Sequence, residues 1–240
     1  MDPHELEYRL VRLRNRVQFL LSPKGDRARH RVFIMGHPHT ATTMLARLFE
    51  SNGYCSQHTA GRWRTDVYKC FADRGNYRPL DLLKRVYPNS TFILNTRPSL
   101  HYMRNRVDRR VRKRLRRGRV RQRFTDRYLR GEIRRRNAFF MEFIQQLHGE
   151  SNFLVFNIER PGAFGFMAES MALEGAPEVR PYSGGRQLTD AEAQHIEQAY
   201  ARLGISSDRL NPFVIPGLLG VSNRQRLSEF LVDHADRIYL

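Results

Sequence analysis

The stretch that decides the fold is VFIMGHPHTATTMLARLFE, residues 32–50. Its first four residues form a continuous apolar run, which is typical of a strand buried on both faces of a parallel sheet. Gly36 opens a short loop, and a helical pattern then covers 44–50 until the Asn-Gly turn at 52–53. The stretch therefore predicts a strand, a loop and a helix in succession, the unit from which α/β proteins are built.

Two more apolar runs repeat this strand pattern farther along the chain. They cover 91–94 and 153–156, and helical patterns separate successive runs. Alternating strands and helices predict an α/β fold with a mostly parallel central sheet flanked by helices. At 240 residues we expect one domain, 1–240. The other expected helices are 3–21, 80–86, 100–117, 125–148, 161–173, 190–203 and 222–239.

The first 25 residues contain the N-terminal helix. Asp2 and Pro3 are start signals, and the Ser-Pro-Lys-Gly sequence at 22–25 is a stop signal. Apolar residues recur in between at steps of three and four, which predicts an amphipathic helix. These apolar positions are Leu6, Leu10, Leu13, Val17 and Leu20.

The composition is that of a folded protein without a membrane span. Hydrophobic residues make up 40% of the chain, and no apolar run approaches the roughly 20 residues that cross a bilayer. Two cysteines, Cys55 and Cys70, are too few for a disulfide framework or a structural zinc site. We therefore expect a cytoplasmic protein without a bound metal.

The net charge of +18 is concentrated in one segment. Residues 104–136 hold seventeen basic and three acidic residues, a net of +14, within an arginine-rich helical segment that covers 99–148. Three interpretations stay open: a solvated basic face, a surface for an anionic small molecule or glycan, and a nucleic-acid-binding stripe. Base stacking is weakly supported, because Phe124 and Tyr128 are the only aromatic residues in 104–136.

The loop after the first strand has the chemistry of an anion site. Backbone N–H groups and the helix dipole converge on a loop that leaves a buried strand and enters a helix. A usual P-loop has a lysine just before its Ser/Thr, but Ala41 or Thr42 stands there, which disfavours a magnesium-dependent kinase. The alternative is a turn whose threonines only cap the helix. The predicted anion-binding residues are Gly36, His37, Pro38, His39, Thr40, Ala41, Thr42 and Thr43.

This loop resembles the 5′-phosphosulfate-binding loop of sulfotransferases that use 3′-phosphoadenosine-5′-phosphosulfate (PAPS), written Gly-x-Pro-[Arg/Lys]-[Ser/Thr]-Gly-Thr-Thr. His39 replaces the basic residue and Ala41 replaces the second glycine. A second motif, YPNSTFILNTR at 87–97, resembles the family's Tyr-Pro-x-Ala-x-Phe-Ile-x-x-x-Arg strand. In that family the arginine and a serine eight residues later hold the 3′-phosphate. The resemblance implies that role for Arg97 and Asn105.

The resemblance spans roughly 31–175 and implies a fold and an activity. The fold is the P-loop-like α/β fold of sulfotransferases. The activity is transfer of a sulfuryl group from PAPS, without a metal, to a hydroxyl or amine. The acceptor is an unidentified small molecule, glycan or natural product, and an anionic acceptor is one of the alternatives. Two alternatives stay open: a nucleic-acid- or polyanion-binding protein that uses 104–136, and a nucleotide kinase-like P-loop protein.

Two histidines are the predicted catalytic residues. His39 stands in the place of the family's lysine or arginine, where an imidazolium would stabilise charge on the leaving phosphate oxygens. His58 follows the first crossover and is predicted to be the general base that takes the proton of the acceptor hydroxyl. Its rivals for that role are Asp66, Asp73 and Asp81.

Overall fold

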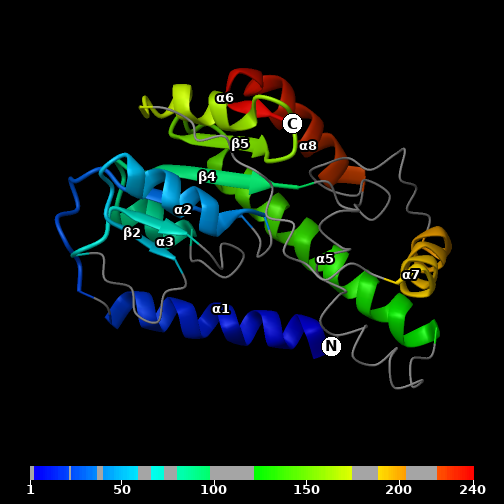
Figure 1. Ribbon diagram of the computed structural model, residues 1–240. Helices are drawn as coiled ribbons and strands as arrows, with labels where there is room; N and C mark the ends of the chain where they lie inside the picture. Colours follow the sequence, from blue (N-terminus) through cyan, green and yellow to red (C-terminus); the bar gives the residue numbers. More distant parts are fainter. Residues whose placement is uncertain are drawn as a thin grey trace.

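Six parallel strands form one sheet in the part of the chain that the structure describes (Figure 1). The computed structural model describes residues 3–21, 23–36, 40–58, 66–72, 80–97, 122–174, 189–203 and 221–240. The strand order is β2-β3-β1-β4-β5-β6, and every neighbouring pair is parallel. The predicted α/β fold with a parallel central sheet is confirmed. The strands are β1 Val32–Ile34, β2 Ser56–His58, β3 Cys70–Ala72, β4 Thr91–Thr96, β5 Phe153–Asn157 and β6 Ile238–Tyr239.

Helices cover both faces of this sheet. One face packs against α2 and α6, and the opposite face packs against α3, α5, α8 and one end of α1. The strands divide accordingly: Val32 and Ile34 of β1 point to the first face, and Phe33 points to the second. The predicted helix 100–117 lies outside the described residues. The helices are α1 Pro3–Leu21, α2 Thr42–Ser51, α3 Leu80–Val86, α5 Gln122–Leu147, α6 Ala163–Ser170, α7 Asp190–Arg202 and α8 Val221–Asp233.

The direction of winding reverses between β1 and β4. The connection after β1 runs through α2 toward β2, whereas the connection after β4 leads through α5 to β5 on the other side. In open parallel sheets, ligands bind outside the carboxyl ends of the two strands where the connections diverge. Gly36 follows β1 and Arg97 follows the adjacent β4, so the fold brings both predicted motifs to this position.

The end of the chain differs from its prediction. The helix predicted over 222–239 ends at Asp233, and after a short 3₁₀ turn the chain adds the edge strand β6 beside β5. Strand pairing satisfies backbone groups at the edge of β5, which a continued helix could not do. The Tyr239 hydroxyl also donates a 2.6 Å hydrogen bond to the Pro161 carbonyl, and its ring stacks on Phe166.

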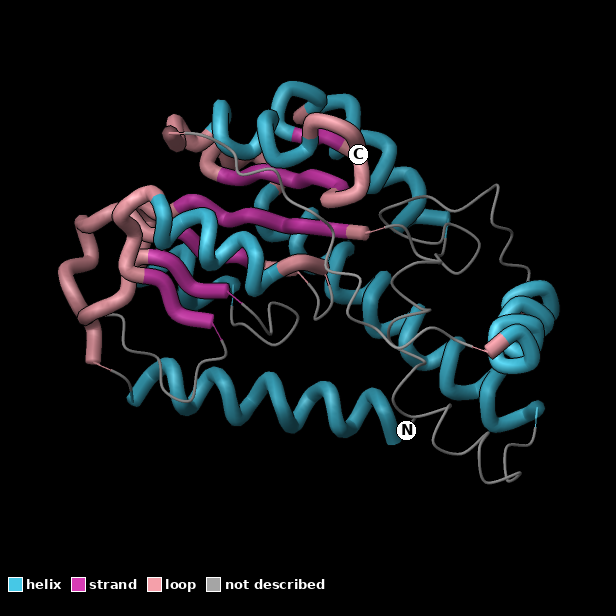
Figure 2. Tube along the Cα trace, viewed as in Figure 1, coloured by secondary structure: helices cyan, strands magenta, loops and turns pink. Residues whose placement is uncertain are grey.

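Helix α1 has the predicted bounds and runs below the sheet in Figure 2. Phe19 is fully buried and meets the ring of Tyr87 edge-on. Arg16 makes two contacts with the carboxylate of Asp81 and so joins α1 to α3. The predicted apolar positions, by contrast, are 47–59% exposed. The helix therefore packs on the fold through a side other than its apolar stripe.

Candidate functional site

A buried amide of β4 closes the loop that follows β1. Asn95 is fully buried, and its Oδ1 accepts a 2.9 Å hydrogen bond from the Gly36 N–H. Its Nδ2 donates to Thr40 Oγ1 at 2.9 Å and to the Thr40 carbonyl. One side chain thus holds both ends of the loop 36–40. A Cβ on Gly36 would lie 2.1 Å from Asn95 Oδ1, so this close approach requires glycine.

Ala41 turns the chain from this loop into α2. It has a left-handed backbone (φ 63°, ψ 25°), and its carbonyl accepts hydrogen bonds from the N–H groups of Met44 and Leu45. This conformation costs an L-residue about 1–2 kcal/mol. Ala41 stands where the sulfotransferase pattern has its second glycine, the residue that adopts this conformation without strain.

The N-cap residue of α2 supplies no side-chain hydrogen bond to the N–H groups of the first turn. The N-cap is Ala41, which has no side chain that could accept a hydrogen bond. No side chain therefore caps α2 from the N-cap position, and the alternative of a turn that only caps the helix stays open. A helix start without a side-chain cap, together with the positive end of the helix dipole, favours an anion at this position.

His58 lies beside the first turn of α2. It ends β2, and its Nε2 lies 2.9 Å from Thr43 Oγ1 and 3.4 Å from Thr42 Oγ1. Thr42 is a buried residue, whereas Thr43 is exposed. The structure thus brings His58 to the predicted loop, in contact with two of its threonines. Through this contact His58 holds the two hydroxyls in place, a role that the sequence did not predict.

The aspartates that rival His58 as general base are less well placed. The Asp81 carboxylate is paired with Arg16. Asp66 precedes β3 and therefore lies at the amino edge of the sheet, opposite the loop. Asp73 lies outside the described residues. So do four of the other predicted site residues, whose assignments stay predictions: His37, Pro38, His39 and Asn105.

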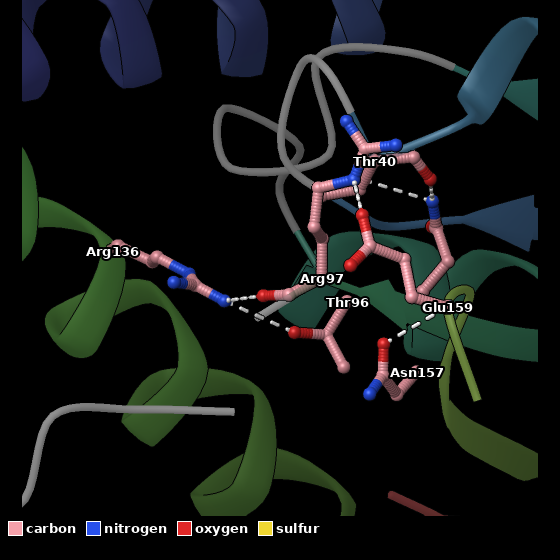
Figure 3. A network of polar contacts seen from close by, with 7 residues as sticks. Thr40, Thr96, Arg97, Arg136, Asn157 and Glu159 are labelled. Carbon is pink, nitrogen blue, oxygen red and sulfur yellow. Dashed lines mark hydrogen bonds and ion pairs between the residues drawn. The ribbon is translucent and has the colours of Figure 1, made fainter. Parts of the chain in front are cut away.

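Arg97 leaves β4 at the carboxyl edge and pairs with a carboxylate (Figure 3). Its Nε lies 2.7 Å from Glu159 Oε1, and the two side chains are 13% and 23% exposed. Glu159 follows β5, and its backbone N–H donates to Asn157 Oδ1 at 3.1 Å. A guanidinium carries several N–H donors in a planar fork, so one contact through Nε does not exhaust its capacity to bind anions. The sequence analysis did not identify Glu159.

A second arginine supports Arg97 from α5. Arg136 is buried, and its Nη2 donates to Thr96 Oγ1 at 3.2 Å and to the Arg97 carbonyl at 2.5 Å (Figure 3). Its guanidinium lies over the Phe140 ring, 5.1 Å from the centroid. These contacts fix the end of β4 and with it the backbone from which the Arg97 side chain departs.

The described part of the arginine-rich segment contains both a buried and several exposed arginines. Arg136 is buried at the candidate site, whereas Arg127, Arg130 and Arg134 are exposed on α5. The described exposed arginines fit a solvated basic face. Residues 99–121 lie outside the described part, so the ligand-binding interpretations of the segment stay predictions.

Comparisons with known proteins give no match for this chain, neither among family models, nor among curated proteins, nor among solved structures. In the described ranges, no group of three or more His, Cys, Asp or Glu residues could hold a metal ion. Nor is any helix in these ranges long and apolar enough to cross a bilayer. The features that bear on function are therefore the loop, the threonines and the arginines at the carboxyl edge of the sheet.

Proposed function

We propose that this chain is a sulfotransferase that uses PAPS and acts on a hydroxyl or amine of a small-molecule or glycan acceptor. The observation that carries the proposal is the meeting of two distant motifs at the point where the winding reverses. The loop after β1 is tied to β4 by Asn95, and Arg97 emerges from β4 two residues later. A nucleotide with a 5′- and a 3′-phosphate needs two anion sites, one for each phosphate.

The loop suits the 5′-phosphosulfate end of such a nucleotide. Gly36 lets the backbone approach Asn95 closely, and the left-handed turn at Ala41 directs the chain into a helix whose first N–H groups have no side-chain cap. These groups stabilise an anion through hydrogen bonds and through the helix dipole. The exposed hydroxyl of Thr43 adds a donor. Because the loop lacks the P-loop lysine, it favours this ligand over a magnesium-bound triphosphate.

Arg97 suits the 3′-phosphate. A guanidinium binds phosphate through two parallel, charge-assisted hydrogen bonds. The contact of Glu159 with Nε orients the guanidinium, and the contact of Arg136 with the Arg97 carbonyl fixes the backbone. Because Arg97 directly follows β4, the strand next to β1, the two proposed phosphate positions would lie at the same edge of the sheet.

The chemistry divides into tasks for named residues. PAPS supplies a sulfuryl group whose bond to the phosphate oxygen breaks as its bond to the acceptor oxygen or nitrogen forms. The N–H groups at the start of α2, with the Thr43 hydroxyl, would stabilise the charge on the leaving oxygen. His58 is the described candidate for the acceptor proton. Its Nε2 lies against Thr43, and when that hydroxyl donates to the leaving oxygen it accepts from Nε2–H, so the acceptor proton would go to Nδ1 of His58.

Titration calorimetry with 3′-phosphoadenosine-5′-phosphate (PAP), the nucleotide product of the reaction, tests this proposal. We expect PAP to bind in the presence of EDTA and to bind more tightly than ATP with or without Mg²⁺. Magnesium-dependent binding of ATP with no response to PAP would contradict the proposal and favour a kinase-like protein. Binding of mixed-sequence RNA with a steep salt dependence, again without PAP binding, would favour the polyanion-binding alternative.

A further inference from the structure

Helix α1 presents an apolar seam to the outside of the fold. The seam consists of Leu6, Leu10, Leu13, Val17 and Leu20, each 47–59% exposed. Phe19, which points away from the seam, is fully buried. Because α1 is held through Phe19 and through the ion pair of Arg16 with Asp81, the seam stays accessible while the helix remains attached to the fold.

The spacing of the seam is that of a coiled coil. Its residues follow one another at strict steps of four and three, which is the a/d pattern of the heptad repeat. Leu6, Leu13 and Leu20 occupy d positions, and Leu10 and Val17 occupy a positions. This two-position stripe is narrower than the apolar face of helices that lie on membranes or pack on a sheet.

We propose that α1 is a dimerisation helix whose seam is covered by α1 of a second copy of this chain, in antiparallel orientation. The flanking charges select the orientation. In a parallel pair, Arg9 at a g position would face Arg14 of the second copy at an e position, and like charges would repel. In the antiparallel register that pairs Leu10 with Leu13 of the second copy, the e position of Glu7 faces that of Arg14, and opposite charges attract.

The same register brings the g positions of Arg9 and Arg16 together, and the structure offsets this repulsion. Arg16 already donates to both carboxylate oxygens of Asp81, with Nη1 at 3.0 Å from Oδ1. Its charge is therefore neutralised within its own chain. Since the seam covers only about two and a half heptads, the dimer is expected to be weak and its population to depend on concentration.

Sedimentation velocity on the full chain tests the proposal. Between about 1 and 100 μM we expect the wild type to shift from monomer to dimer as concentration rises. Leu13→Glu at the centre of the seam should leave a monomer throughout. Leu21→Glu is the matched control, because Leu21 is 80% exposed on the same helix but lies outside the a and d positions. It should dimerise as the wild type does.

Charge reversal tests the orientation. Arg14→Glu should weaken an antiparallel dimer at least severalfold, because the new carboxylate faces Glu7 of the second copy, and adding Glu7→Arg should restore association. A parallel dimer would instead be strengthened by Arg14→Glu, through Arg9 of the second copy, which would overturn the orientation.

Three further results bear on the proposal. A wild type that stays monomeric over the whole range overturns it. Binding of the monomer to vesicles of phosphatidylserine and phosphatidylcholine, lost in Leu13→Glu, would assign the seam to a membrane surface instead. Circular dichroism and thermal melts of dilute protein should be the same for the Leu13, Arg14 and Leu21 variants, since these three side chains are solvent-exposed in one copy. A collapsed melt for Leu13→Glu alone would show that the seam packs within its own chain and overturn the dimer.

Discussion

One arginine lies where the parallel strands begin, at the amino edge of the sheet, and another lies where they end, at the carboxyl edge. The two arginines have different partners. Arg31 precedes β1 at the amino edge, where its Nη1 donates to the carbonyls of Asp26 and Arg29 at 2.5 and 2.9 Å. Its guanidinium also lies over the Tyr87 ring, 4.4 Å from the centroid. Arg97 follows β4 at the carboxyl edge and pairs with the Glu159 carboxylate. An arginine bound to backbone carbonyls organises the fold, whereas one oriented by a carboxylate through Nε keeps its other N–H groups for a ligand.

Two asparagines show the same contrast. At the amino edge, Asn152 donates a 2.7 Å hydrogen bond to the Ser90 carbonyl and so joins the segments that enter β4 and β5. At the carboxyl edge, Asn95 bonds to both ends of the loop before α2. The asparagine at the amino edge thus joins two strands to each other, whereas the asparagine at the carboxyl edge fixes the two ends of a loop that leads into a helix.

The largest effect is expected from removing the carboxyl-edge asparagine. Asn95→Ala should lower the free energy of unfolding by about 2–4 kcal/mol, because it leaves the buried Gly36 N–H and Thr40 without their partner. It should also weaken PAP binding by more than about tenfold, since the loop loses its shape. Urea unfolding and calorimetry measure the two effects.

Asn152→Ala is the matched control at the amino edge. It should cost about 1 kcal/mol of stability and leave PAP affinity unchanged. Asn95→Asp keeps the acceptor for Gly36 but loses the donor to Thr40, so we expect an intermediate loss in both measurements. Equal loss of PAP affinity in Asn95→Ala and Asn152→Ala would erase the distinction between the edges.

A smaller effect is expected from the histidine on β2. His58→Ala should weaken PAP binding severalfold, about 1 kcal/mol, because the Thr43 hydroxyl loses its partner. His58→Gln should recover most of that affinity, since an amide also contacts a hydroxyl. His30→Ala is the control at the amino edge, where the ring of His30 contacts Thr91 Oγ1 at 3.0 Å. Titration of the three variants with PAP decides the matter: if His58→Ala binds as tightly as His30→Ala, His58 does not organise the loop.

The smallest effect is expected at the left-handed turn. Ala41→Gly should raise the free energy of unfolding by about 1 kcal/mol, because glycine adopts a φ of 63° without strain. The same exchange within α2, Ala46→Gly, should lower it by about 1 kcal/mol or more through helix propensity and lost packing. Paired urea melts measure the difference. A destabilised Ala41→Gly would refute the account of the turn.

The sequence predicted the three strands that lie in recognisable apolar runs, β1, β4 and β5, and missed β2, β3 and β6. β1, β4 and β5 were identified because buried parallel strands are continuous apolar runs. β2 reads Ser-Gln-His at the edge of the sheet, and β6 has two residues after a helix. Neither has an apolar pattern that distinguishes it from the residues around it. β3 reads Cys-Phe-Ala and is buried, but three residues are too few to stand out from their surroundings. These strands exist because a neighbouring strand offers them hydrogen bonds.

The sequence predicted only part of the candidate site, because only some of its residues stand next to strands with an apolar run. The loop and Arg97 stand next to recognisable strands, so sequence position was enough to place them. Asn95 had a signal that was not used, namely an amide that directly follows the apolar residues of a buried strand. Glu159 and Arg136 had none, because their contacts with Arg97 depend on how β5 and α5 pack beside β4.

The central claim is that the arginine of the carboxyl edge recognises a 3′-phosphate, and the affinities for PAP and for adenosine 5′-monophosphate, which lacks that phosphate, test it most directly. We predict that the wild type prefers PAP by about tenfold to a hundredfold, the value of a charge-assisted contact. Arg97→Ala should bind the two nucleotides equally, whereas Arg85→Ala, an exposed arginine at the end of α3, should keep the preference. An undiminished preference for PAP in Arg97→Ala would contradict the claim.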